Sequence, residues 1–224
     1  MKTLLITGIG KGIGHALAEE GLRRGHAVIG TYLTQKPTFA HPNLTMLPLD
    51  LSSPQSIKRC TDKLCASRKK IDILINNAGI LGDENETSVI VQKLRKTLEV
   101  NLIGTIDFTE RMLPAIKKDG QVINISSSAG SLAWVDKEKS HFPLHYPAYK
   151  ISKAALNMYT RTLALRLAAT GPAVSSVHPG WVRTGMGGSD ADLSPSQAAA
   201  RIFDFAKKRP ATGGFWFGKK QIPW

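Results

Sequence analysis

The chain has 224 residues, of which 42% are hydrophobic, so it is long enough to bury the core of one globular domain spanning residues 1–224. Its formal net charge is +13, and it contains no apolar run of about 18 residues, which excludes a membrane-spanning helix. The basic residues are scattered, without interleaved aromatics, so we expect a solvated surface or attraction of anionic ligands, and no nucleic-acid site.

Apolar runs of strand length alternate with longer segments of helical periodicity. In chain order we expect a strand over 2–7, a helix over 13–24, strands over 26–32 and 44–49, a helix over 54–66, a strand over 71–76, a long helix over 87–117, a strand over 121–126, a helix over 149–169, a strand over 173–178, a helix over 195–207 and a short final strand within 213–224. Because the strands are too apolar to have a solvated face, we predict a parallel sheet of six or seven strands with helices on both faces, the doubly wound α/β class.

The N-terminus indicates the expected compartment, and the spacing of the two cysteines indicates what they do not form. Residues 1–14 predict a strand and a turn rather than an apolar signal core, which makes the cytosol the expected location. Cys60 and Cys65 are five residues apart on a predicted helix, so their side chains diverge by about 140°. We therefore expect neither a disulfide nor a metal site from them.

A glycine-rich stretch, ITGIGKGIG, joins the first predicted strand to the first predicted helix. Ile13 stands where a GxGxxG motif needs glycine, and the pattern that fits is TGxxxGIG. The N–H groups that open a helix favour a pyrophosphate, and glycine allows positive φ and close approach of a ligand. A tight turn without a ligand is the alternative for this stretch alone. The glycines are Gly8, Gly10, Gly12 and Gly14.

Further motifs lie at the predicted carboxyl ends of strands, where sheets of this class bind ligands. They are NNAG at 76–79, ISSSAG at 125–130, YKISK at 149–153 and PGWVRT at 179–184. In this order, together with the glycine-rich loop, they resemble the classical short-chain dehydrogenase/reductase family from about residue 2 to residue 184. The resemblance implies a single Rossmann-type domain and a nicotinamide-dependent oxidoreductase.

Four segments resemble one branch of that family, the C-factor and sniffer branch. They are SKAALNMYTRTLALRL from Ser152, HPGWVRTGMGG from His178, LSPSQAA from Leu193 and the terminal Pro223–Trp224. Sniffer-type members are carbonyl reductases, so the resemblance implies NADPH-dependent reduction of a small aldehyde, ketone or quinone. C-factor is a signalling protein, and an NADP(H)-binding regulator with incidental catalysis is therefore the alternative. The family also implies a homodimer or tetramer that packs through the helices expected over 87–117 and 149–169.

Tyr149 and Lys153 are four residues apart and share one face of a predicted helix. A nearby ammonium lowers the pKa of a phenol below its ordinary value near 10. We therefore expect Tyr149 to exchange a proton with the substrate's carbonyl oxygen as hydride reaches the carbon. Taken alone, Tyr149 would be interpreted as a half-buried helix tyrosine.

The resemblance adds three further roles to this pair. Ser127 would hold the substrate's carbonyl oxygen, Lys153 would also bind the nicotinamide ribose, and Asn101 would anchor a water linked to the lysine. Ser126 and Ser128 are rival serines, and alignment on the following glycine favours Ser127.

The resemblance also assigns a set of cofactor contacts. The glycine-rich loop with Ile13 would hold the pyrophosphate, and Tyr149 and Lys153 would contact the nicotinamide ribose. The remaining positions are Asn77, Ala78 and Gly79 on the adenosine side, Asp50 with Leu51 at the adenine, Val182 and Thr184 at the carboxamide, and Pro179 and Gly180 in the same loop. A helix-capping role is the alternative for Asp50.

Two positions favour NADP(H) over NAD(H). An acid at the end of the second strand would repel a 2′-phosphate, and Tyr32 stands there, between Thr31 and Leu33. Lys11, just before the third glycine of the loop, is placed to pair with a 2′-phosphate. NAD(H) stays as the alternative because some NADP-dependent relatives carry arginine where this chain has Leu33, and Lys11 has the alternative of an exposed loop cation.

Residues 131–148 are expected to border the substrate pocket, because loops at strand ends carry specificity. For the histidines of this loop, contact with the substrate and simple exposure to solvent are alternative interpretations. The short polar stretch 185–192 leaves little material for a lid, so we expect an open site. The candidate residues of the longer loop are Trp134, His141, Phe142, His145 and Tyr146.

Overall fold

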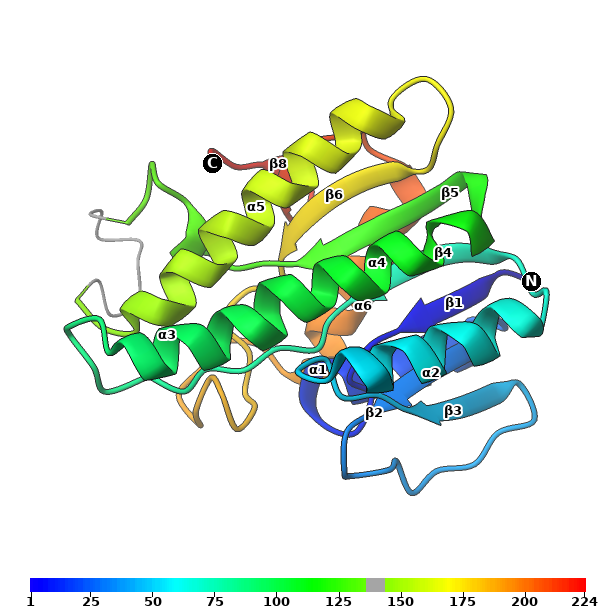
Figure 1. Cartoon of the computed structure of the whole chain (residues 1–224), viewed down its shortest axis with the longest axis horizontal. Coiled ribbons are helices and arrows are strands. Elements are labelled where there is room, and N and C mark those ends of the chain that lie inside the picture. Colours follow the sequence, from blue (N-terminus) through cyan, green and yellow to red (C-terminus); the bar gives the residue numbers. More distant parts are fainter. Residues whose placement is uncertain (136–143) are drawn as a thin grey trace.

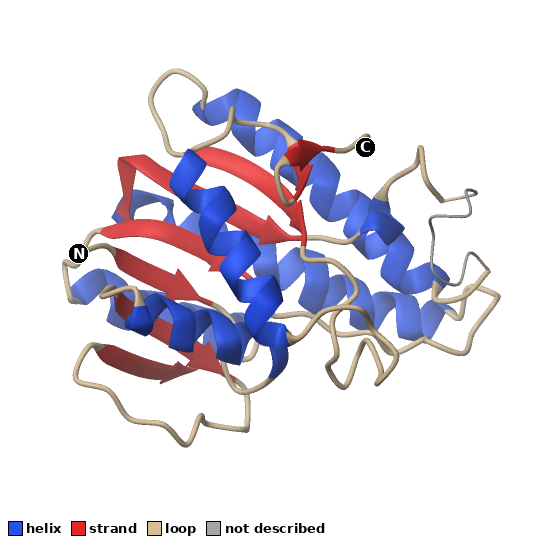
Figure 2. Ribbon diagram, turned by 180° about the vertical axis from the view of Figure 1, so that it is seen from behind, coloured by secondary structure: helices blue, strands red, loops and turns tan. Residues whose placement is uncertain are grey.

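An eight-stranded sheet forms the centre of the computed structural model, which describes residues 1–135 and 144–224 (Figure 1). The strands are β1 (Thr3–Ile6), β2 (Ala27–Tyr32), β3 (Leu44–Pro48), β4 (Ile71–Asn76), β5 (Ile116–Ile125), β6 (Ala173–His178), β7 (Phe215–Phe217) and β8 (Lys220–Gln221). The α-helices are α1 (Gly12–Arg23), α2 (Pro54–Ala66), α3 (Val91–Leu98), α4 (Thr105–Met112), α5 (Pro147–Leu167) and α6 (Pro195–Lys208). Helices cover both faces of the sheet, which confirms the predicted α/β class (Figure 2).

The strand order is β3-β2-β1-β4-β5-β6-β7-β8, and all neighbouring strands are parallel except β7 and β8. The chain proceeds outward from β1 to β3, and then returns to place β4 on the other side of β1. Ligands of doubly wound sheets bind at such a reversal, beyond the carboxyl ends of the strands. The added antiparallel β8 brings the sheet to one strand more than the upper limit that we expected.

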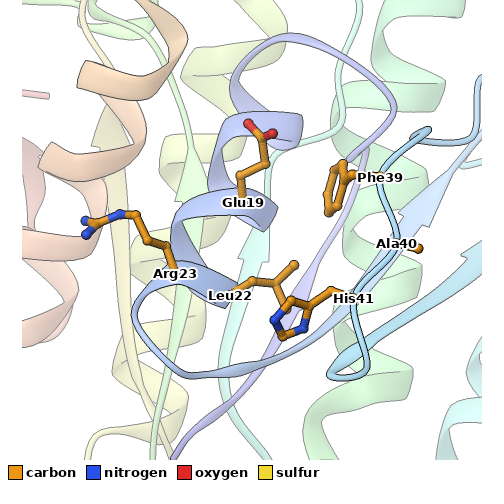
Figure 3. A pocket seen from close by; sticks show the side chains of 6 residues that line it. All are labelled: Glu19, Leu22, Arg23, Phe39, Ala40 and His41. Atoms are coloured by element: carbon orange, nitrogen blue, oxygen red, sulfur yellow. The ribbon is translucent and has the colours of Figure 1, made fainter.

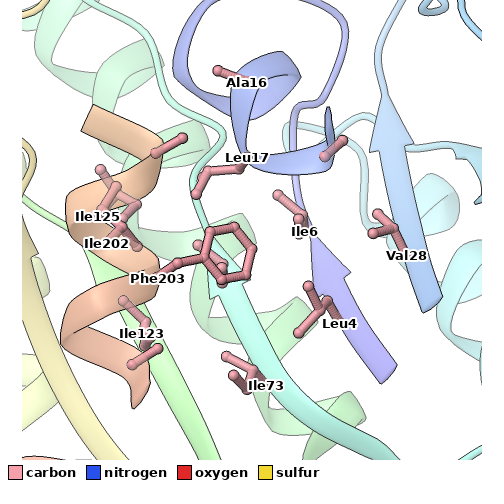
Figure 4. Packing of buried hydrophobic residues seen from close by; sticks show 14 of the residues in the cluster. Leu4, Ile6, Ala16, Leu17, Val28, Ile73, Ile123, Ile125, Ile202 and Phe203 are labelled. Atoms are coloured by element: carbon pink, nitrogen blue, oxygen red, sulfur yellow. The ribbon is translucent and has the colours of Figure 1, made fainter. Parts of the chain in front are cut away.

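The sheet is buried on both faces because successive side chains point to opposite sides. Leu4 and Ile6 of β1 pack in one hydrophobic cluster, beneath α1 and α6, whereas Leu5 packs in the other. Figure 4 shows Leu17 and Phe203 of the two helices over the strands. These three apolar residues of β1 are fully buried, which explains the uninterrupted apolar pattern of the strands.

Two helices begin where the sequence predicted, and each is capped by a serine side chain. Ser53 precedes Pro54 at the start of α2, and its hydroxyl accepts a hydrogen bond from the Ser56 N–H at 3.2 Å. Ser194 and Gln197 form a reciprocal capping box at the start of α6. These local hydrogen bonds explain why the start of each helix could be predicted from the sequence.

The long helix expected over 87–117 is wrong in two respects. It begins only at Val91, and a π-helix over Glu99–Gly104 separates α3 from α4. Gly104 packs so closely on the Leu51 carbonyl oxygen that a Cβ atom there would overlap it. The Thr105 hydroxyl donates to the Val100 carbonyl oxygen at 3.1 Å, inside the widened turn. The π-helix turns Asn101 inward, where its side chain is buried.

The strand expected over 121–126 begins earlier, at Ile116. The pairing with β4 shifts between Ile71 and Ile73, so that Ile71 lies opposite Ile116 and Ile73 opposite Gln121. The intervening Lys118 and Asp119 are exposed and conceal the strand in the apolar pattern. This irregularity lies at the end of the sheet opposite the motifs.

Two expectations from composition can be checked directly. Cys60 is buried and Cys65 is exposed, and both thiols are free, which confirms that they form no disulfide. Among the described residues, no helix combines the length and the apolar character that a membrane crossing requires.

Candidate active site

Hydrogen bonds connect the glycine-rich loop to the NNAG segment at the end of β4. The Thr7 hydroxyl accepts hydrogen bonds from the backbone N–H groups of Asn77 and Ala78, both at 3.0 Å. The Asn77 amide donates to the carbonyl oxygens of Thr7 at 2.9 Å and Gly8 at 3.2 Å. The Asn77 side chain therefore shapes the loop rather than facing a ligand.

The loop has the backbone geometry of an anion cradle. Gly8 and Gly12 have φ angles of +75° and +59°, in the left-handed region that favours glycine. A Cβ atom at Gly12 would lie 3.2 Å from Thr184 Cγ2, so the loop after β6 meets the cradle. The first turn of α1 contains no acidic residue, and therefore no carboxylate there offsets the positive end of the helix dipole. These residues fit a dinucleotide pyrophosphate.

Gly14→Ala should test this cradle. The new methyl group would overlap the Gly8 carbonyl oxygen and lie 2.5 Å from Asn77 Nδ2, so the loop must move. We expect dinucleotide affinity to fall by at least about tenfold, and the melting temperature to drop as well. Isothermal titration and thermal unfolding measure both. Gly82→Ala is the matched control, because a Cβ there meets nothing within 4 Å; equal dinucleotide affinity in both variants would contradict the cradle.

Helix α5 brings Tyr149 and Lys153 together at the carboxyl end of β5. Lys153 Nζ lies 5.5 Å from the centre of the Tyr149 ring and donates to the Ile125 carbonyl oxygen at 2.8 Å. The lysine is 5% exposed. The predicted shared helix face is therefore present, with the ammonium above the ring and its hydrogen bond directed to the sheet.

The pKa of Tyr149 differs from the expected direction. Burial raises the pKa of its phenol to about 12, while hydrogen bonding to Ser127 acts in the opposite direction. Burial also lowers the pKa of the Lys153 ammonium to about 8. This direction is opposite to the lowering that we expected, because burial of the phenol outweighs its hydrogen bond to Ser127.

Ser127 and Asn101 flank this pair. Ser127 opens a short 3₁₀ turn over Ser128–Gly130, and its hydroxyl accepts from the Ala129 N–H at 3.2 Å. The Asn101 amide exchanges hydrogen bonds with the backbone of Ile80, at 2.7 and 2.9 Å, and donates to the Ser152 hydroxyl at 3.1 Å. A Cβ atom at Gly79 would lie 3.2 Å from Asn101 Oδ1 and 3.7 Å from Lys153 Nζ, so NNAG borders the pair.

The remaining predicted cofactor positions surround the cradle. The Thr31 hydroxyl accepts from the Gly8 N–H at 3.4 Å, and Tyr32, the last residue of β2, is followed in the sequence by Leu33 and not by an acid. Lys11 is exposed at the N-cap of α1, without a capping hydrogen bond from its side chain. Asp50 Oδ1 accepts from Ser52 N at 2.8 Å and from Ser52 Oγ at 2.6 Å, a local turn ahead of α2. The N-cap of α2 is Ser53, so Asp50 stabilises a turn before the helix and does not cap the helix itself.

The loop after β6 turns toward the glycine-rich loop. Gly180, which follows Pro179, has a φ of +95° and so makes a turn that favours glycine. The Val182 carbonyl oxygen accepts from the Thr184 hydroxyl at 3.3 Å. The approach of Thr184 to Gly12 brings this loop beside the cradle.

The expected substrate loop is described in part. Tyr146 contacts the Tyr149 ring edge to face, with ring centres 6.0 Å apart. Leu132 and Leu144 are exposed, at 76% and 74%. His141 and Phe142 lie outside the described residues. The described ends of the loop thus place the Tyr146 ring against Tyr149 and leave two leucine side chains exposed.

One residue of the site was missed from the sequence. Asp83 is buried, and its Oδ2 accepts from the Ala148 N–H at 2.6 Å, at the start of α5. Tyr146 donates its N–H to the Glu86 carbonyl oxygen at 2.9 Å. The segment after NNAG therefore fixes the start of the helix that carries Tyr149. A lone aspartate in a loop gives no sequence signal for such a contact.

A surface hollow lies elsewhere, between α1 and the segment before β3 (Figure 3). It is lined by Glu19, Leu22, Arg23, Phe39, Ala40 and His41. None of these belongs to the predicted catalytic or cofactor set.

Known proteins resemble this chain in sequence and in fold. The sequence model of the short chain dehydrogenase family matches residues 2–193. C-signal of Myxococcus xanthus is 32% identical over 165 residues, which cover 69% of this chain and 93% of that protein. A short-chain dehydrogenase/reductase from Burkholderia multivorans with bound NADP has a TM-score of 0.88 and 31% identity, covering 100% of this chain and 99% of that one.

The carbonyl reductase Sniffer of D. melanogaster has a TM-score of 0.87 and 27% identity, and the match covers 100% of both chains. The expected resemblance to carbonyl reductases and C-factor is thereby confirmed. From its sequence and its fold, this chain belongs to the short chain dehydrogenase family of oxidoreductases.

Proposed function

We propose that the chain is an NADPH-dependent carbonyl reductase that converts a small aldehyde, ketone or quinone to an alcohol. The observation that carries this proposal is the convergence of Ser127, Tyr149 and Lys153 beside a glycine cradle. Its support includes a relative with bound NADP and another named as a carbonyl reductase. NADPH, when bound, supplies the hydride.

The chain's own residues supply the proton and hold the substrate's oxygen. With a pKa of about 12, the Tyr149 phenol carries its proton at neutral pH and suits the donor's role in reduction. Ser127 already interacts with that phenol, and its hydroxyl would hold the substrate's oxygen as a preorganised contact. The Lys153 ammonium above the ring would stabilise the phenolate that remains.

The other predicted site residues would bind the cofactor and align it with the substrate. The glycine-rich loop with Ile13 would bind the pyrophosphate, and Lys153 would also bind the nicotinamide ribose. Asn101 supports the segment beside Lys153 through Ile80 and Ser152, which fits a part in ordering water near the ammonium. The loop positions Val182 and Thr184 would hold the carboxamide, while Ala78 and Leu51 would line the adenosine side.

Paired titrations with NADPH and NADH test the cofactor preference. We expect NADPH to bind at least about tenfold more tightly, because Lys11 is exposed beside the cradle and no acid stands at Tyr32. Lys11→Ala should reduce this preference, whereas Lys69→Ala, at an exposed lysine beyond α2, should leave it intact. Equal affinity for both dinucleotides in the unaltered protein would contradict the assignment.

Oxidation of NADPH against a panel of aldehydes, ketones and quinones then tests the reaction. Turnover would support the reductase.

The second candidate is an NADP(H)-binding regulator, which the 32% identity to C-signal favours. For that candidate, NADPH must change the affinity for a partner or the oligomeric state.

We also propose a homodimer or tetramer through α5, whose Ile151, Met158 and Leu165 are exposed at seven-residue intervals.

A further inference from the structure

The polar face of α5 extends beyond the two predicted catalytic residues. Its members follow one another at intervals of about one helical turn and face β5 or the turn after it. They are Tyr149, Lys153, Asn157 and Thr160. The first two are predicted catalytic residues. Asn157 and Thr160 are buried, and neither was assigned a role from the sequence.

Asn157 forms hydrogen bonds with both ends of the turn that contains Ser127. Its Oδ1 accepts from the Ser126 hydroxyl at 2.7 Å, and its Nδ2 donates to the Gly130 carbonyl oxygen at 3.1 Å. Ser126 is 2% exposed and Asn157 is 3% exposed, so both hydrogen bonds are shielded from water. Residues 127–129 are thus enclosed between two contacts to a single side chain.

The turn is closed by its own hydrogen bonds and lies directly on α5. A Cβ atom at Gly130 would come within 2.6 Å of the Lys153 carbonyl carbon and 2.8 Å of Ala154 N. The Gly130 N–H donates to the Ser127 carbonyl oxygen at 2.9 Å, and the Ser127 hydroxyl accepts from Ala129 N. With the turn closed internally, the contacts to Asn157 determine where the Ser127 hydroxyl lies relative to α5.

We propose that Asn157 and Ser126 are positioning residues that align the Ser127 hydroxyl with the Tyr149 phenol across the contact between β5 and α5. An amide suits this position because it offers an acceptor to Ser126 and a donor to Gly130, whereas leucine offers neither. The effect on turnover rests on the proposed function, but the alignment of the two hydroxyl groups does not.

Asn157→Leu and Ser126→Ala remove these contacts, and Thr160→Val is the matched control. Thr160 is buried one turn further along α5 and accepts from Asn124 and Ser176, both at 2.8 Å, but it does not touch the Ser127 turn. All three variants should lose stability. Only the first two should lose kcat, by about tenfold to a hundredfold, with the KM for NADPH nearly unchanged.

A measurement without substrate separates this proposal from the proposed function. In protein labelled at tyrosine 13Cζ, the Tyr149 resonance is identified by its disappearance in Tyr149→Phe. We expect Asn157→Leu and Ser126→Ala to shift it in the same direction as Ser127→Ala, while Thr160→Val leaves it in place. If Asn157→Leu fails to fold, Ser126→Ala decides alone. An unmoved Tyr149 resonance in the folded variants, or an equal loss of kcat in Thr160→Val, would overturn the proposal.

Discussion

Tyr149→Phe is expected to reduce turnover by at least about a hundredfold while NADPH affinity changes by less than about twofold. The substitution removes one hydroxyl group and keeps the ring that lies beneath Lys153 and against Tyr146. Hydride transfer would then lack a proton donor to the substrate's oxygen. Steady-state kinetics and fluorescence titration with NADPH separate the loss of chemistry from a loss of binding.

Tyr159→Phe is the matched control for that variant. Tyr159 lies on the same helix, but its hydroxyl donates to Glu110 at 2.9 Å, away from the predicted site. We expect it to keep its turnover and to lose only a little stability. A Tyr149→Phe enzyme as active as the unaltered protein would exclude Tyr149 as the proton donor.

Lys153→Met is expected to stabilise the fold at neutral pH and to abolish turnover. Burial lowers the pKa of Lys153 from 10.5 to about 8, so the buried ammonium costs about 3 kcal/mol, at about 1.4 kcal/mol for each tenfold change in proton affinity. Methionine has a similar length and no charge. Loss of the hydrogen bond to Ile125 offsets about 1 kcal/mol of the gain.

The pH dependence of this gain has a defined sign. Below pH 8 the lysine is protonated in both the folded and the unfolded chain, and the cost of burial is fully present. Between pH 8 and 10.5 the folded chain releases the proton first, so its stability rises with pH relative to Lys153→Met. Urea unfolding at pH 7 and pH 10 should therefore show a gain that shrinks toward the higher pH.

Lys96→Met, which removes an exposed ammonium on α3, is the control for this experiment. It should show no such pH-dependent gain. A Lys153→Met protein that is less stable than the unaltered one at pH 7 would contradict the stated cost of the buried charge. Retained turnover would exclude the lysine from the reaction.

Much of the site could be predicted because its determinants are local in the sequence. Continuous apolar runs identified the strands, and the glycines at 8 and 12 matched the positive φ angles of the loop. The four-residue spacing of Tyr149 and Lys153 placed them on one helix face. Such features need only neighbouring residues, and therefore they are visible without knowledge of the tertiary structure.

The features that were missed depend on contacts between distant parts of the chain. The π-helix reflects the approach of Gly104 to Leu51, and Asp83 meets Ala148 across 65 residues of sequence. The pKa of Tyr149 is raised by burial, which is a property of the assembled site and not of the YKISK motif. Asn157 likewise acquires its role only when the turn after β5 packs against α5.

The two outer strands of the sheet limit how copies of this protein can associate. β8 is two exposed residues long and antiparallel to its neighbour, and β3 ends in the exposed Pro48, which has no N–H to donate. Short edges and edge prolines are poor templates for a further strand. Edge-to-edge addition of sheets is therefore disfavoured at both sides, which directs self-association of the folded chain to its helical surfaces.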